Sequence, residues 1–598
     1  MSKTVENTPS NATPQAPAGE LVTALREVGR HSPHERARVL LRHNLTRALA
    51  NIMPTQDLLI TCKAAAREDR AALLRLLPNG AMQRLWDLDV WSHHRLQPDR
   101  LGSWLQTLRE AGTECATRQL QNLDTEMLGL LLKVFIQVHE AEASESLNLG
   151  NAPHAFTPDR QFLLVSRQPD RDVFDCLGGF IELLYGTKPL FATRLLQAIR
   201  WETPSSLEEA ALHWRDARLQ DLGFLPCGDC QRVLTYTNPQ RALKQLTTAA
   251  RPSSNAQTPN PLSRHLIPAR LQAVVHNAAP HSLKQALDEI DDAQALESIA
   301  RQLMVLTNRV HAAWHKDLGD EEELGATVRN TLACLRIALE TLSQTHKKTA
   351  SHWLLQSPLQ QLFQLGRSLP LHLAKQLRKA ARTHGIANLA ALTPTLDHPL
   401  RETVQGLLRR EPVLYGELVP REKPTKTKQP VTYRPFESLQ DIATAAQATT
   451  EAAFRLTLLW GNGGIAATSK FNGEEARSFT CATLLATWMS NGLLAGKPKL
   501  RPLRKSELAA LRQLVRQRGA AGNLPDQLRV KACGWVARWA EEHAPLPGAA
   551  TVDEAASRAG HYAELALRTM QEELASITDS MPDLRYVHSV WVKPNQNS

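Results

Sequence analysis

Two short motifs have the residue types and spacing of metal ligands. The first is a CxxC motif, Cys227-Gly228-Asp229-Cys230, which can supply half of a zinc site or a redox pair. A structural zinc site needs four ligands, and the chain has no second CxxC. Thioredoxin-like redox chemistry would need a βαβ context, which the surrounding sequence does not indicate. We therefore interpret the motif as a loop between helices.

The second motif places His311 and His315 four residues apart, so both imidazoles lie on one face of a helix and could chelate a metal. The HExxH pattern of metalloproteases would need Glu at position 312, which is Ala. We interpret this segment as a partly buried helix around Trp314 with polar flanks. The sequence thus predicts no metal and no cofactor.

A basic segment near the C-terminus is the strongest charge signal. Its positions 506–516 predict a helix with Leu508, Leu511 and Val515 inward and the arginines largely outward. Such a helix after a basic arm can neutralise phosphates, although no aromatic residue is present to stack on bases. The candidate anion or nucleic-acid surface consists of Lys497, Lys499, Arg501, Arg504, Lys505, Arg512, Arg516 and Arg518.

One further cluster of mixed chemistry lies in positions 199–225. Trp, Arg and Asp side chains recur there at helical spacing, as expected for a structural stack or for the wall of a pocket. Its members are Trp201, Trp214, Arg215, Asp216 and Arg218. No GxSxG motif or other recognisable nucleophile context occurs in the chain, so the sequence predicts no catalytic residue.

Composition predicts the elements that position these residues. The 598 residues include 42% hydrophobic, 22% charged and only 5% aromatic residues, and good helix formers dominate. Eight scattered cysteines do not form a disulfide framework, and no apolar run reaches the roughly 20 residues of a membrane span. We expect an all-α protein of the cytoplasm, not inserted in a membrane. Its net charge of +10 is compatible with an anionic partner.

A repeated helix-start signature predicts the architecture of the first 140 residues. Pro54, Pro78, Pro98 and Asp124 each precede an apolar segment, with Thr, Asn or Asp nearby to cap it. Recurrence at this spacing is typical of stacked helices, so we expect an irregular, solenoid-like helical repeat. The polar stretch 141–160 is expected to be a loop, and 163–165 a short strand or extended segment.

Proline-rich and polar stretches divide the chain into three expected helical blocks. A disordered tail at 1–19 precedes a helical-repeat domain at 20–250. A linker at 251–261 leads to a second block at 262–417, and a Pro/Lys-rich linker at 418–435 leads to a C-terminal helical domain at 436–598.

Several stretches of the first block together combine tryptophans with Asp and Arg at particular places. They are 85–91, 95–100, 104–105, 200–202 and 214–224. In these stretches the chain resembles a bacterial family catalogued as domain of unknown function 6178, from about 51 to 225 and more weakly to 415. No family pattern is evident beyond the second linker. More distantly, the helix starts resemble helical repeats of magnesium-transporter and flagellar-switch proteins.

The resemblance implies a bacterial, soluble, helical protein and no particular activity. The leading hypothesis is therefore a non-catalytic scaffold or adaptor that binds a protein partner. One alternative is a nucleic-acid-binding protein that uses the basic C-terminal segment. The other is an enzyme with an unrecognised site, for which the cluster around Trp214 is the first place to look.

Overall fold

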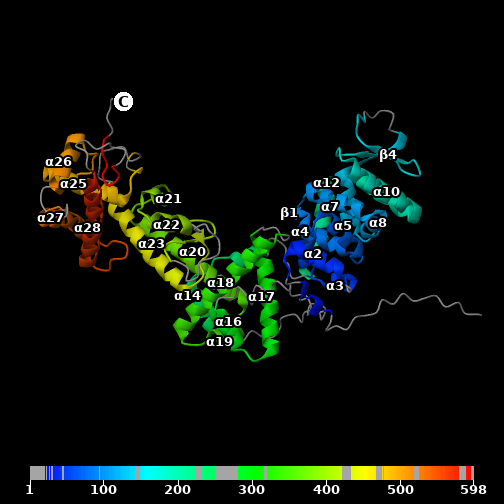
Figure 1. The fold of residues 1–598 in the computed structure, drawn as a ribbon, viewed down its shortest axis with the longest axis horizontal. Coiled ribbons are helices and arrows are strands. Elements are labelled where there is room, and N and C mark those ends of the chain that lie inside the picture. The colour runs from blue at the N-terminus through cyan, green and yellow to red at the C-terminus, as the bar shows by residue number, and fades with distance from the viewer. Residues whose placement is uncertain are drawn as a thin grey trace, which may run out of the picture. The chain divides into compact units, whose positions relative to one another are not determined.

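The computed structural model describes residues 21–593 apart from several gaps, and the chain within these limits is an all-α protein with a few small sheets (Figure 1). The gaps are residues 22, 26, 29–30, 44–45, 93, 143–148, 222–229, 249–280, 315–319, 420–432, 467–474, 476, 517–523 and 578–586. The expected tail at 1–19 and the expected linker at 251–261 lie outside the described residues. No described helix is both long enough and apolar enough to cross a membrane.

The predicted helix starts are confirmed. Pro54 directly precedes α4, Pro98 is the first residue of α7, and the 77–80 segment turns into α6 through Gly80, whose φ of 73° is left-handed. The Asp124 carboxylate accepts a hydrogen bond of 2.6 Å from the backbone N–H of Met127 and so caps α9. The helices of this region are α2 (Pro33–Arg42), α3 (Thr46–Ile52), α4 (Thr55–Ala64), α5 (Arg67–Leu76), α6 (Ala81–Asp89), α7 (Pro98–Ala111), α8 (Thr113–Leu120), α9 (Thr125–Phe135), α10 (Arg171–Thr187), α11 (Pro189–Trp201) and α12 (Pro204–Asp221).

A small sheet interrupts the helices. Strand β3 (Ile136–Glu140) follows α9 directly and pairs antiparallel with β5 (Phe162–Ser166), which also pairs with β4 (His154–Phe156). The expected strand at 163–165 is confirmed, but the expectation of a loop throughout 141–160 is wrong because β4 lies within it. A two-stranded ladder, β1 (Trp91–Ser92) and β2 (Arg95–Leu96), separates α6 from α7.

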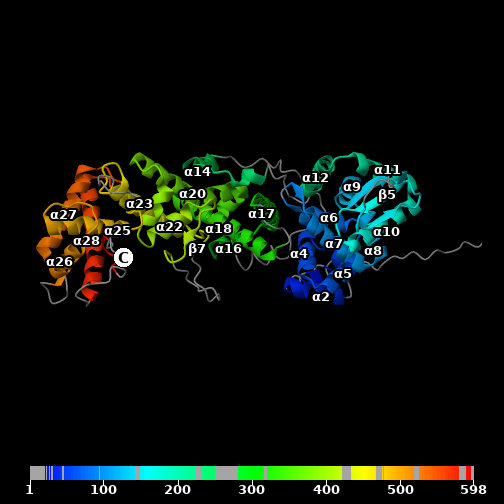
Figure 2. The same ribbon diagram turned by 90° about the horizontal axis from the view of Figure 1, so that it is seen from above.

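One hydrophobic core joins these helices and the sheet. It runs from Ala24 to Leu219 and includes the fully buried Leu59, Leu85, Leu105 and Leu131. Helix α9 packs against both α11 and α12 (Figure 2). Because α9 is apolar on most of its circumference, it can be covered on several sides at once.

Contacts divide the chain into two compact units. The first comprises Met1–Thr235, Thr248–Leu335 and His346–Gln364, and the second comprises Tyr236–Thr247, Arg336–Thr345 and Leu365–Ser598. Elements of the middle of the chain are the 3-10 helix η2 (Gln231–Leu234), α14 (Pro239–Thr248), α16 (His281–Asp288), α17 (Ala293–Ala313), α18 (Glu321–His346), α19 (Ala350–Gln356) and α20 (Leu359–Thr383). The expected second block, 262–417, is therefore shared between the two units.

Four helices pack together at the C-terminal end of the second unit: α25, α26, α27 and α28 (Figure 1). The elements that follow α20 are α21 (Leu389–Leu392), the 3-10 helix η4 (Thr393–Thr395), α22 (Leu400–Leu407), β6 (Leu414–Tyr415), β7 (Tyr433–Arg434), α23 (Leu439–Trp460), α25 (Cys481–Ala495), α26 (Lys505–Arg516), α27 (Asp526–Glu542) and α28 (Val552–Ser576).

The stretch 418–435 does not separate two cores. Leu377 and Val404, which precede it, lie in the same hydrophobic core as Phe454 and Leu567, which follow it. β6, which lies just before the stretch, pairs with β7, which lies near its end. The unit boundary thus differs from the expected one because apolar contacts, rather than local composition, hold these segments together.

Candidate functional site

The predicted basic surface is divided by the structure into structural and exposed residues. Arg501 donates two hydrogen bonds, of 2.8 and 2.7 Å, to the Glu507 carboxylate. These bonds lower the pKa of Glu507 to about 2. Lys497, Lys499, Arg504 and Lys505 are exposed, whereas Arg518 lies outside the described residues.

Arg512 is not on the outward face where the sequence analysis placed it. It is 4% exposed and donates a hydrogen bond of 2.7 Å to the backbone carbonyl of Ile577. Arg516 donates to the same carbonyl. Positions 508, 511, 512 and 515 follow the i, i+3, i+4, i+7 pattern of the buried face of a helix, so Arg512 belongs to that face despite its charge.

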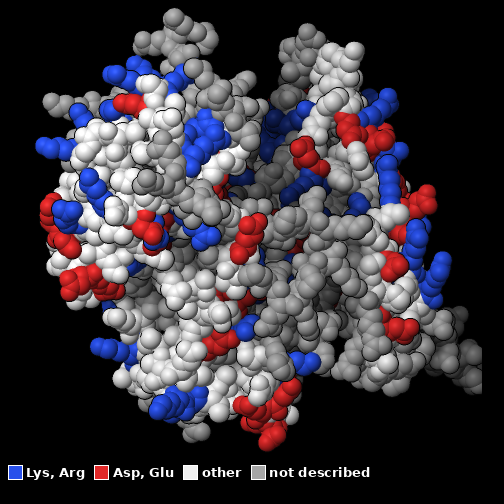
Figure 3. Space-filling model, turned by 60° about the vertical axis from the view of Figure 1, so that its left-hand side comes forward, with Lys and Arg blue, Asp and Glu red and all other residues white. Residues whose placement is uncertain are grey.

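Charge is mixed on one face of the described surface. On the face shown in Figure 3, Lys and Arg side chains are interspersed with Asp and Glu side chains. An interspersed surface attracts an anionic polymer less than a uniform basic field does. The described part of this face is therefore not a uniform basic surface.

The predicted Trp, Arg and Asp cluster separates into a partly buried part and an exposed part. Arg218 binds Asp87 through two hydrogen bonds, Nε to Oδ2 at 2.7 Å and Nη2 to Oδ1 at 2.8 Å. Its remaining nitrogen, Nη1, donates to Asp124. Arg215 donates from Nε to the Asp87 carbonyl at 2.7 Å and from Nη1 to Asp216 at 3.2 Å. These contacts join α6, α9 and α12, so this part of the cluster stabilises packing.

Neither tryptophan of the cluster takes part in that network. Trp201 is 75% exposed at the end of α11, and Trp214 is 50% exposed on α12. Both rings are therefore exposed and are not stacked in a buried cluster with Arg215 and Asp216. The cation stacked on Trp201 is Arg200, whose guanidinium lies 4.8 Å from the ring centroid.

The two predicted metal motifs are described only in part. His311 is fully buried, and its Nδ1 lies 3.0 Å from the Thr327 hydroxyl. Cys230 is also buried. His315 and Cys227 lie outside the described residues. Among the residues that the structure does describe, no group of three or more His, Cys, Asp or Glu side chains is placed to hold a metal ion.

A partly buried ionic network in the second unit was missed by the sequence analysis. Asp397 accepts hydrogen bonds from the Tyr562 hydroxyl at 2.7 Å and from Arg455 Nη1 at 3.0 Å. Arg455 and Arg558 each donate to Glu451 at 2.8 Å. Burial raises the pKa of the Tyr562 phenol well above its ordinary value. Because the partners come from segments up to 165 residues apart, no local motif marks them.

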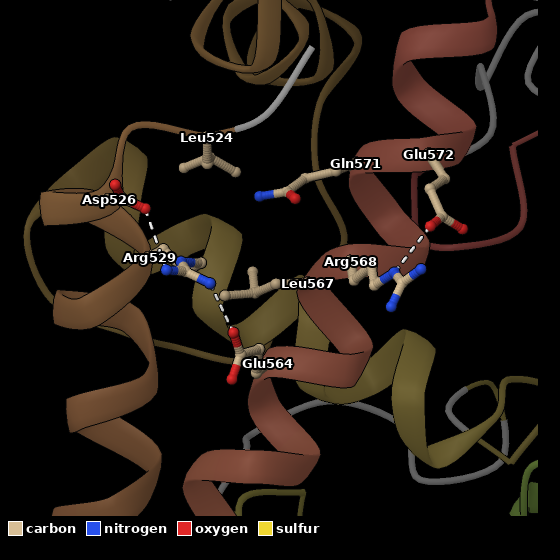
Figure 4. A pocket seen from close by; sticks show the side chains of 8 residues that line it. All are labelled: Leu524, Asp526, Arg529, Glu564, Leu567, Arg568, Gln571 and Glu572. Atoms are coloured by element: carbon tan, nitrogen blue, oxygen red, sulfur yellow. Dashed lines mark hydrogen bonds and ion pairs between the residues drawn. The ribbon is translucent and has the colours of Figure 1, made fainter. Parts of the chain in front are cut away.

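A cavity of about 520 Å³ lies between α27 and α28 (Figure 4). Arg529 forms ion pairs with Asp526 at 3.0 Å and with Glu564 at 2.6 Å, while Arg568 pairs with Glu572 at 2.9 Å. The full lining is Leu524, Asp526, Arg529, Glu564, Leu567, Arg568, Gln571 and Glu572. The sequence analysis named none of these residues.

The fold and these clusters define an all-α protein in which most of the grouped charges stabilise helix packing. Comparison with protein families identifies its family: a model of a family of unknown function, DUF6178, matches residues 15–593. The chain belongs to this family. The match extends through both units and past 435, where the sequence analysis found no family pattern. No curated protein and no solved structure matches the chain.

Proposed function

We propose that this protein is a non-catalytic binding protein that contacts a partner protein through the outer face of α11. The observation that carries the proposal is the exposure of two large apolar side chains on that helix, Leu190 at 77% and Trp201 at 75%. Tryptophan is enriched among the residues that dominate the binding energy of protein interfaces, and Leu190 adds a second exposed apolar side chain.

The two side chains lie on the same face of α11. They are 11 residues apart, which at 100° per residue brings them within roughly 20° of each other and about 16 Å apart along the axis. Arg194 and Gln197 lie between them and are also exposed. The opposite face of α11, with Leu195, packs into the core. We call this surface, which has Leu190 and Trp201 at its ends and a basic and a polar residue between them, the α11 stripe.

Contacts with the rest of the unit fix the C-terminal end of α11, where Trp201 lies. Lys133 donates from Nζ to the Ile199 carbonyl at 2.5 Å, near the end of α11. Arg200 forms an ion pair with Glu140 on β3 and stacks over Trp201. A side chain ordered before binding loses less conformational entropy in the complex, which favours its use as an anchor.

The nucleic-acid alternative has less support. Of the basic residues on which it depends, Arg512 is buried and Arg501 is paired with Glu507. The other described cations of that surface are Lys497, Lys499, Arg504 and Lys505, which lie close together in the chain, and Arg516, which donates to the Ile577 carbonyl. They are fewer than an extended field along a run of phosphates would need. The exposed Leu190 and Trp201 of the α11 stripe favour a protein partner over a nucleic acid with its phosphate backbone.

The test is a pull-down from an extract of the source organism with three forms of the full chain. They are the wild type, the variant L190A/W201A, and the control V530A/L565A, which removes two apolar side chains that are 66% and 48% exposed on α27 and α28. We expect the wild type and the control to capture the same protein and L190A/W201A to lose it, with all three equally helical by circular dichroism. Capture of the same proteins by all three forms, or of none, would contradict the proposal.

A further inference from the structure

The cavity between α27 and α28 combines a buried floor with a charged rim. The lining includes two apolar side chains, Leu567, which is fully buried, and Leu524, which is 3% exposed. The rim is open to solvent: the side chains of Glu564 and Arg529 are 51% and 41% exposed. A volume of about 520 Å³ is in the range of small-molecule sites.

Gln571 is a buried residue of this cavity whose side-chain amide lacks a hydrogen-bond acceptor within the described part of the chain. It is only 6% exposed, and its amide Nε2 has no hydrogen-bond partner among the described residues. Figure 4 shows its side chain extending from α28 into the space between Leu524 and Leu567. A buried amide N–H without a partner destabilises the folded state. A ligand that supplies a hydrogen-bond acceptor to this N–H would remove that cost, which favours its binding.

The charged groups offer both a donor and an acceptor to such a ligand. Arg529 uses one N–H of each terminal nitrogen for Asp526 and Glu564, which leaves a second N–H on each. Glu564 accepts through Oε1, and its Oε2 carries further acceptor capacity. These ion pairs are exposed and therefore weak, so sharing them with a ligand costs little.

We propose that this cavity is a binding site for a free α-amino acid with an apolar side chain. Its carboxylate accepts from Gln571 Nε2 and Arg529, and its ammonium group donates to Glu564. Its side chain lies against Leu524 and Leu567. A simple anion is disfavoured because Asp526, Glu564 and Glu572 outnumber the two arginines of the lining. This site is separate from the α11 stripe, and neither proposal depends on the other.

Calorimetric titration of the full chain tests the assignment, with L-leucine, L-methionine and L-phenylalanine as probes. We expect at least one to bind with a Kd of about 1 mM or tighter. The N-acetyl derivative lacks the ammonium group and the methyl ester lacks the carboxylate, so we expect each to bind at least about tenfold more weakly. Equal binding of either derivative, or no binding of any probe at about 10 mM, would overturn the proposal.

Two variants separate the site from non-specific effects. Q571M replaces the amide by an apolar side chain of similar length, and E564Q removes the charge while keeping the shape. We expect each substitution to raise the Kd of the amino acid at least about tenfold. The matched control is E541Q, which changes an exposed glutamate of α27 outside the cavity and should bind like the wild type. Unchanged binding by Q571M and E564Q would show that the amino acid binds outside this cavity, which would overturn the proposal. Because Q571M removes an unpaired amide, its melting midpoint without ligand should not fall.

Discussion

At the scale of single residues, the position of a side chain on its helix decides its role more than its charge does. The inward placement of Leu508, Leu511 and Val515 could be predicted from helical spacing and is confirmed. The inward placement of Arg512 could not be predicted, because a basic residue beside the apolar face of a helix is normally expected to point to solvent. Its partner is a carbonyl 65 residues away, which no local pattern reveals.

The burial of Arg512 predicts a loss of stability on truncation. R512A removes the donor to the Ile577 carbonyl and leaves a cavity, so the free energy of unfolding should fall by about 1–3 kcal/mol. The control R504A removes an exposed arginine of the same segment and should stay within about 0.5 kcal/mol of the wild type. Urea unfolding followed by circular dichroism measures both. An equal effect of the two substitutions would refute the structural role.

The pair of Arg501 with Glu507 predicts a pH dependence of stability. The folded-state pKa of Glu507 is lowered from 4.5 to about 2, so its stabilising contribution is complete above about pH 4.5 and is lost as the pH falls toward 2. The difference in unfolding free energy between the wild type and E507Q should be constant near neutrality and shrink in that window. A difference that does not change between pH 6 and the acid limit would show that the pair is not formed.

At the scale of elements, capping residues could be predicted from the sequence and strand pairing could not. Pro54, Pro98 and Asp124 mark helix starts through local backbone chemistry, and all three lie at those positions. Strand β4 was missed because its only support is pairing with β5, several residues further along the chain. The bonds from Arg218 to Asp87 were also beyond sequence reasoning, since 131 residues separate the two.

The double role of Asp124 predicts an ordered series of variants. Its side chain caps α9 through the Met127 N–H and also binds Arg218 of α12. D124N keeps a capping oxygen and loses the charge, whereas D124A loses both. We expect D124A to be destabilised by about 1 kcal/mol more than D124N, the usual value of a cap, and both to be less stable than the wild type. Equal stabilities of D124N and D124A in urea would contradict the cap.

At the scale of the whole molecule, the chain consists of two units whose boundaries differ from the compositional ones. Proline-rich stretches report local chain chemistry, but the core of the second unit joins Leu377 and Val404 to Phe454 across 418–435. The helical class could be predicted because it depends on summed propensities. The exposed face of α11 could not, since exposure of Leu190 and Trp201 depends on what the remaining helices cover.

The central claim is that the α11 stripe binds a protein partner, and a single affinity measurement tests it most directly. Once the captured partner is purified, its dissociation constant is measured for the wild type and for W201A. Loss of a tryptophan anchor typically costs about 2 kcal/mol or more, so W201A should bind at least about 30-fold more weakly while its melting midpoint is unchanged. Equal dissociation constants for the two proteins would contradict the claim.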